Sequence, residues 1–118
     1  MKHINESIIG RKGVGYKKYE LTDETISYDY GHILYRIIAL KDIPSIRVKE
    51  GDLGGWIESY ANLDQKGDCW VADDALVFGN AKVYGNAKVY GSASVCGNAE
   101  VFGSANVNYF INTGKITK

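Results

Sequence analysis

The chain contains little proline, cysteine or histidine. It has one Pro, two Cys and two His among 118 residues. Cys69 and Cys96 are too few for the disulfide framework of a small secreted domain. His3 and His32 cannot supply the three histidines of a zinc site within one chain. We therefore expect neither a disulfide scaffold nor a bound metal, and no motif indicates another cofactor.

An excess of charge of one sign is also missing, as is a long apolar run. Lys plus Arg number 14, Asp plus Glu number 14, and the net charge is zero. Such a balance gives no general attraction to nucleic acid or to a membrane surface. No apolar stretch approaches the ~20 residues of a membrane span, and no hydrophobic signal region follows Met1. These absences favour a cytoplasmic protein.

Glycine is abundant, and it is periodic. The chain has 14 Gly together with nine Tyr, three Phe and two Trp, a composition that argues against disorder. Copies of a six-residue unit start at Val77, Val83, Val89, Val95 and Val101. The same register extends back to Leu53 and forward through Val107, which predicts ten hexads over residues 53–112.

Each hexad combines a short apolar strand with a bend. In the clearest copies Val occupies the first position and Ala the fifth, while Gly-Asn or Gly-Ser fills the third and fourth. Gly accepts positive φ freely, and Asn tolerates it better than most residues do. Neither helix periodicity nor simple strand alternation produces this spacing.

This pattern resembles the hexapeptide-repeat, left-handed parallel β-helix family, in which three hexads complete one coil. The resemblance, rather than the residues, implies the left hand. We therefore expect an all-β fold, a left-handed parallel β-helix of about three coils of 18 residues with an N-terminal β-hairpin cap. The expected division is a β-rich cap over 1–52, the β-helix over 53–112 and a tail over 113–118.

The cap is expected because segments 26–30 and 33–40 alternate as strands on either side of Gly31-His32. Residues 46–48 form a possible third strand after Pro44. An uncapped β-helix would expose unpaired strand edges, so repeat arrays need such a cap.

The second position of the hexad faces outward by this register, yet it often carries an aromatic residue. Exposed apolar rows usually mark interaction surfaces. Alternatively, the N-terminal segment covers one face. We favour an oligomer or partner interface formed by Phe78, Tyr84, Tyr90, Phe102, Tyr109 and Phe110.

A basic, Gly-rich stretch precedes the hairpin. Arg11, Lys12, Lys17 and Lys18 could contact an anion such as a nucleotide phosphate, although the Walker spacing is absent. The alternative is a solvated loop.

Enzymes of the resembled family depend on residues that the hexads lack. Its acyltransferases use a histidine general base, its carbonic anhydrases three histidines, and its ice-binding members ranks of threonine. No histidine follows His32, and no threonine lies between Thr25 and Thr113. Cys96 has no histidine beside it in the repeats, and Cys69 occupies a core position. The hexads thus predict a protein that is not an enzyme.

A closer resemblance is to small phage and prophage proteins. It rests on segments 18–22, 34–37 and 51–58, followed by 67–71 and the Gly-Asn-Ala repeats. This resemblance implies a phage origin but supplies no activity. The exposed aromatic residues, the rigid scaffold and the missing catalytic set instead predict a non-enzymatic binding protein in the host cytoplasm, one that inhibits a host defence component by occupying a protein partner. The alternatives are a nucleotide-binding sponge, a self-assembling structural protein, and an acyltransferase that uses His32 of a neighbouring subunit. A homodimer or homotrimer is expected.

Overall fold

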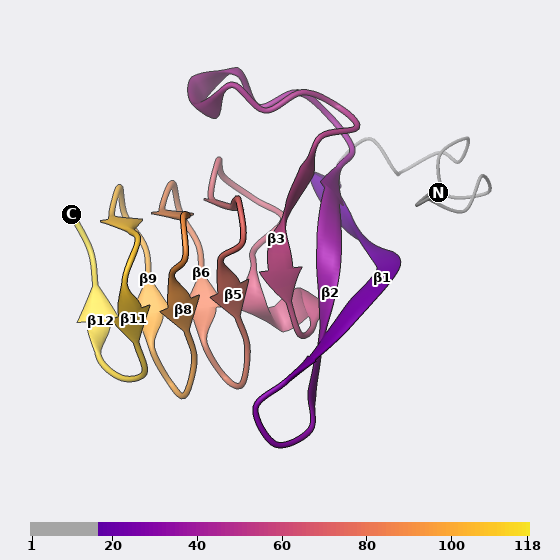
Figure 1. The fold of residues 1–118 in the computed structure, drawn as a ribbon. Coiled ribbons are helices and arrows are strands. Elements are labelled where there is room, and N and C mark those ends of the chain that lie inside the picture. The colour runs from indigo at the N-terminus through magenta and orange to yellow at the C-terminus, as the bar shows by residue number, and fades with distance from the viewer. Residues whose placement is uncertain (1–16) are drawn as a thin grey trace.

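The computed structural model describes residues 17–118, which form β-strands and two short 3₁₀ turns (Figure 1). The two long strands come first and the two-residue strands of the repeats follow. In chain order the elements are β1 Tyr19–Tyr28, β2 His32–Ala39, η2 Pro44–Ile46, β3 Leu53–Ile57, η3 Tyr60–Asn62, β4 Trp70–Val71, β5 Leu76–Val77, β6 Lys82–Val83, β7 Lys88–Val89, β8 Ser94–Val95, β9 Glu100–Val101, β10 Asn106–Val107, β11 Phe110–Ile111 and β12 Lys115–Ile116.

The short strands stack into three parallel sheets, one for each face of a β-solenoid. The sheet orders are β3-β5-β8-β11, β4-β7-β10 and β6-β9-β12, with neighbours hydrogen-bonded. Val77 pairs with Val95, Val83 with Val101 and Val71 with Val89, each 18 positions apart. The expected fold, a parallel β-helix of about three turns of about 18 residues, is confirmed.

Small apolar residues fill the inside of the coils. The repeat valines and alanines are at most 2% exposed, so each hexad contributes one branched and one small side chain to a single continuous core. The glycines of the bends adopt positive φ. At Gly85 (φ +68°) an added Cβ would also lie 3.0 Å from the Gly103 nitrogen of the next coil. Close stacking of the corners therefore requires glycine there.

The hexad register breaks at both ends of the stack. Ile57 pairs with Val77 and Leu63 with Val83, 20 positions apart in each case. Ile111 pairs with Val95 at only 16 positions. The extra residues lie between Leu63 and Val71, where the corner bulges. An unbroken register from Leu53 is thus wrong.

As a consequence, different side chains point inward in the first coil. Ile57 and Leu63, expected at the fifth position, take the place of the repeat valines and are fully buried. Leu53, expected at the first position, is 50% exposed.

The expected N-terminal hairpin cap is confirmed, and it extends one face of the β-helix. β1 and β2 pair antiparallel around the turn Asp29–Gly31, and β2 pairs antiparallel with β3, the first strand of the coils. Figure 1 shows the free end of this hairpin reaching past the sheet edge. On the outer face Leu34, Trp56 and Phe78 form a second apolar cluster. The hairpin therefore closes the end of the stack and shields part of one face.

The possible third strand at residues 46–48 does not form in the segment between β2 and β3. Pro44–Ile46 is a 3₁₀ turn that ends at Arg47 in the left-handed region. Only one bridge, Ile43 to Val48, relates its two sides. Proline lacks the amide hydrogen that a paired strand would need. Within residues 17–118, no helix has the length and apolar character required to cross a membrane.

Candidate functional site

Two aromatic side chains of the coils stack on the outer surface. The rings of Tyr84 and Phe102 lie 4.9 Å apart and are nearly parallel. The Tyr84 hydroxyl donates to Glu100 at 2.7 Å, and this bond raises the pKa of the tyrosine. The two residues are 18 positions apart, one coil, and they follow the paired valines Val83 and Val101.

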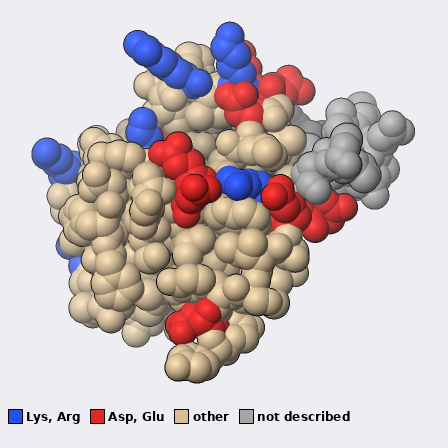
Figure 2. All heavy atoms as spheres, in the orientation of Figure 1, with Lys and Arg blue, Asp and Glu red and all other residues tan. Residues whose placement is uncertain are grey.

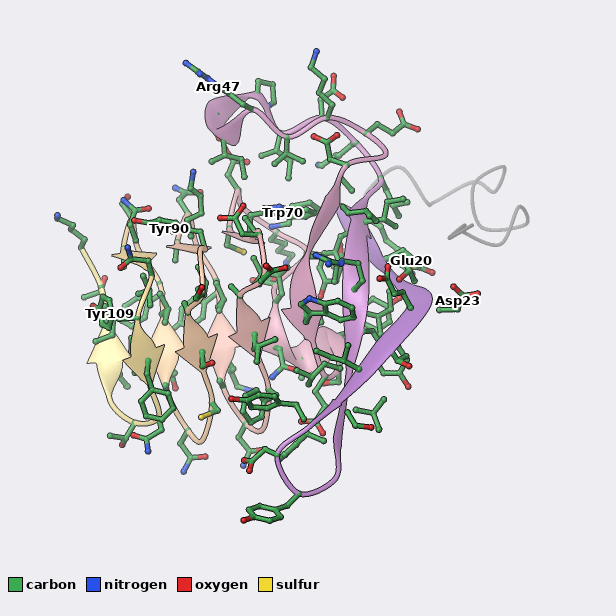
Figure 3. The ribbon with its side chains drawn as sticks, viewed as in Figure 1. Glu20, Asp23, Arg47, Trp70, Tyr90 and Tyr109 are labelled. Atoms are coloured by element: carbon green, nitrogen blue, oxygen red, sulfur yellow. The ribbon has the colours of Figure 1, made fainter. Side chains whose placement is uncertain are left out.

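The other aromatic residues lie elsewhere on the solenoid. Phe78 is only 4% exposed, because the hairpin covers it, so its expected exposure is wrong. Tyr90 follows β7 on another face, while Tyr109 lies at the C-terminal end of the stack (Figure 3). Phe110 is 63% exposed on β11. The six residues do not meet in one surface.

The basic residues of the N-terminal segment give no free anion site among the described residues. Arg11 and Lys12 lie outside these residues. Lys17 pairs with Glu20 at 3.2 Å and lies over the Tyr60 ring. Lys18 is fully buried, and its ammonium donates to backbone carbonyls of the first coil. The expectation of an anion contact at Lys18 is therefore wrong, since its hydrogen bonds are made within the chain.

The hairpin brings a histidine onto the coils. His32 begins β2, and its Nδ1 lies 3.0 and 2.9 Å from the two carboxylate oxygens of Glu58, the residue after β3. An ionised carboxylate can only accept hydrogen bonds, so Nδ1 carries the proton, and in the neutral imidazole Nε2 has a free lone pair. Both side chains are about one-third exposed. A histidine held in one tautomer and open to solvent can act as a general base.

Glu58 is itself held firmly by the first two coils. Its carboxylate accepts the Gly79 amide at 2.8 Å, and its own amide donates to Val77 and to the buried Asn62 side chain. Burial alone would raise the pKa of Glu58, but the bonds from Gly79 and His32 outweigh it and lower the pKa. The carboxylate therefore stays ionised near neutral pH and fixes the imidazole.

Apolar groups surround the histidine. Its ring lies 4.9 Å from that of Phe78, which also meets Tyr28 edge-on at 5.3 Å. Cys96 packs against the same cluster, where burial and the charge of Asp29 raise the pKa of its thiol. Charged side chains gather away from the β5–β8–β11 face in the view of Figure 2, which leaves that face largely uncharged. The dyad thus lies beside an apolar surface.

Sequence reasoning considered His32 only as a contribution from another subunit, and it missed Glu58. The two residues are 26 positions apart, and no local motif joins them. One expectation from the sequence could have indicated this site. If the N-terminal segment covers one face of the coils, His32 lies on the coils of its own chain. Among residues 17–118, no three His, Cys, Asp or Glu side chains form a group suited to a metal ion.

Comparison with known proteins gives one informative match. No protein-family model matches the chain. It is 34% identical over 71 residues to the uncharacterized acetyltransferase YdcK of Escherichia coli (strain K12), which covers 53% of this chain. The chain spans only 21% of that protein's length.

The match and the coil register together support the hexapeptide-repeat β-helix resemblance. The expectation that the chain is not an enzyme is contradicted by this relative, which is named as an acetyltransferase. The hexads contain no histidine, and the histidine that lies beside the coils comes from the hairpin.

Proposed function

We propose that the protein transfers an acyl group from a thioester donor to a hydroxyl or amine acceptor, with His32 as general base. The observation that carries this proposal is the His32–Glu58 pair. The Glu58 carboxylate, which accepts the Gly79 amide, holds Nδ1 of His32 and leaves Nε2 free. The name of the relative in Escherichia coli supports the same reaction class.

The residues present account for the proton movements of such a transfer. Nε2 of His32 takes the proton from the acceptor, whose oxygen or nitrogen then bonds to the acyl carbon. The carbon–sulfur bond of the thioester breaks, and the imidazolium returns the proton to the departing thiolate. The Glu58 carboxylate stabilises the imidazolium between these steps. Glu58 is therefore a positioning residue, and His32 is the proposed catalytic residue.

Turnover of acetyl-CoA with a panel of small amines and hydroxyl compounds, followed by chromatography, tests this proposal. His32→Ala should lower kcat/KM by about 10²–10⁴-fold, the usual contribution of a general base. Glu58→Gln should lower kcat and change its pH profile, because an amide cannot stabilise the imidazolium. Lys41→Ala, in an exposed loop, is the matched control and should leave turnover unchanged. Unchanged turnover in His32→Ala, or no turnover with the whole panel, would contradict the proposal.

Protein binding through the outer aromatic residues is a second candidate function. The specific observation that favours it is the Tyr84–Phe102 stack, which covers the outside of two coils and which no other described aromatic ring contacts closely. The partner we propose is a second copy of the chain. A host protein is the alternative partner, and phage origin stays a prediction.

A further inference from the structure

The end of the solenoid contains a buried lysine–cysteine pair that the proposed reaction does not use. Lys18 and Cys69 are both 0% exposed. The Lys18 Nζ lies 3.2 Å from the Cys69 Sγ and 2.6 Å from the carbonyl oxygen of the same residue. The two side chains come from segments 51 positions apart in the sequence.

The bulged corner of the first coil creates this contact. Two extra residues lie between Leu63 and Val71, and the corner that they form turns backbone carbonyls toward Lys18. The Lys18 ammonium donates to the carbonyls of Gly67 and Cys69. The backbone of Lys18 is fixed as well, because its amide donates to the Gln65 side chain at 2.7 Å. Neither Nζ nor Sγ can move far from the other.

We propose that Lys18 and Cys69 form a covalent nitrogen–oxygen–sulfur bridge when the protein meets dioxygen. The Nζ–H bond of the neutral amine and the Sγ–H bond of the thiol break, and N–O and O–S bonds form. Dioxygen accepts four electrons, two from nitrogen and two from sulfur. One of its oxygen atoms becomes the bridge, and the other leaves as water with both hydrogens.

The surroundings favour this chemistry at Cys69. Burial lowers the pKa of the Lys18 ammonium, partly offset by Cys69, and so increases the fraction of neutral amine. Burial also raises the pKa of the Cys69 thiol, and the nearby Lys18 offsets only part of this rise. The sulfur therefore enters the step as the S–H thiol. At Cys96 the charged group that acts on the thiol is the Asp29 carboxylate, not an amine such as the one beside Cys69. The bridge should therefore be selective for Cys69.

The consequence would be a covalent connection between the start of the hairpin and the first coil. Such a cross-link restricts the unfolded chain, as a disulfide does. The bridged form should have a melting temperature several degrees above that of the reduced form, and a thiol reductant should remove the difference.

Intact mass spectrometry of the native protein tests the bridge. Protein prepared with reductant under nitrogen is exposed to air-saturated buffer and then digested. The expected product gains one oxygen and loses two hydrogens, joins the Lys18 peptide to the Cys69 peptide, and reverts with reductant. An unmodified Cys69, a Cys69 with added oxygen but no link to Lys18, or a loss of two hydrogens without oxygen would each overturn the proposal.

Two variants check the assignment. Lys18→Met should abolish the adduct, whereas Lys17→Met, the neighbouring control, should retain it. If Lys18→Met does not fold, Cys69→Ala replaces it, because Ala87 and Ala105 occupy the same column of the coils and are compatible with it. Persistence of the same mass change in Cys69→Ala would also overturn the bridge.

Discussion

At the scale of single residues, a few buried polar side chains determine how the coils begin. Asn62 is fully buried, and both ends of its amide are bonded. Its oxygen accepts the amides of Glu58 and Ser59, and its nitrogen donates to the carbonyls of Gly79 and Ala81. The side chain thus joins the first coil to the second, close to the His32–Glu58 pair.

We predict that Asn62→Ala lowers the free energy of unfolding by about 2–4 kcal/mol. The substitution leaves buried amide and carbonyl groups without partners, and each such group costs about 1–3 kcal/mol. Asn80→Ala is the control, because Asn80 is exposed and makes one side-chain bond to Asn98. Its effect should stay within about 0.5 kcal/mol. Urea denaturation measures both, and equal effects would contradict the assigned role of Asn62.

The sequence predicted part of this residue-level picture. Asn62, Asn80 and Asn98 are spaced 18 apart, and an unbroken 18-residue coil would place them in one ladder of amides. Asn80 and Asn98 do bond to each other, but Asn62 points inward, since the bulged corner shifts the first coil by two residues. No hydrophobic period encodes such a bulge, because its carbonyls are satisfied by Lys18, a residue from outside the repeats.

At the scale of elements, the hairpin and the coils are connected through Glu58. The carboxylate accepts bonds from β2 through His32 and from the second coil through the Gly79 amide. The strands of the hairpin followed from alternating apolar residues. Its fold over Phe78 did not, because the direction of a hairpin depends on packing at the outer face of the sheet, which sequence periodicity leaves open.

The stabilisation from Glu58 should depend on pH. The pKa of this group is lowered in the folded protein below its ordinary value of 4.5. Its contribution to stability is therefore complete above pH about 4.5 and is lost as the pH falls through the lowered value. We predict that Glu58→Gln is less stable than the native protein at pH 7 and that the difference shrinks as the pH falls below 4.5 and through the lowered pKa.

Urea denaturation of both proteins across this pH range provides the measurement. Glu50→Gln, in an exposed loop, is the control and should show no comparable dependence. A difference between the native protein and Glu58→Gln that stays constant from pH 7 down to the acid limit of the folded state would show that the carboxylate does not act in this way.

At the scale of the whole molecule, the repeat determined the solenoid, but the surface depends on what lies outside the repeat. The Val and Ala positions fix a narrow core, and this pattern was sufficient to predict the stacked coils. Exposure of the second-position aromatics depended on the hairpin, which buries Phe78 and leaves Tyr84 and Phe102 half-buried on another face. The proposed site follows the same division, since its histidine also belongs to the hairpin.

The stacked pair Tyr84 and Phe102 should mediate association between copies of the chain. Buried aromatic anchors contribute strongly to interfaces, often at least about 2 kcal/mol each on truncation, which weakens binding by more than tenfold. We predict that the double variant Tyr84→Ser and Phe102→Ser raises the concentration at which half of the assembly dissociates by more than tenfold. The stack contributes only about 0.5–1.5 kcal/mol to folding, so the coils should remain intact.

Light scattering over a range of concentrations measures this effect, with Tyr90→Ser as the matched control on a different face of the solenoid. If Tyr90→Ser dissociates the assembly and the double variant does not, the interface lies along the β4–β7–β10 face instead. A native protein that stays monomeric at every concentration would remove self-association altogether, and the aromatic stack would then be available to a different protein.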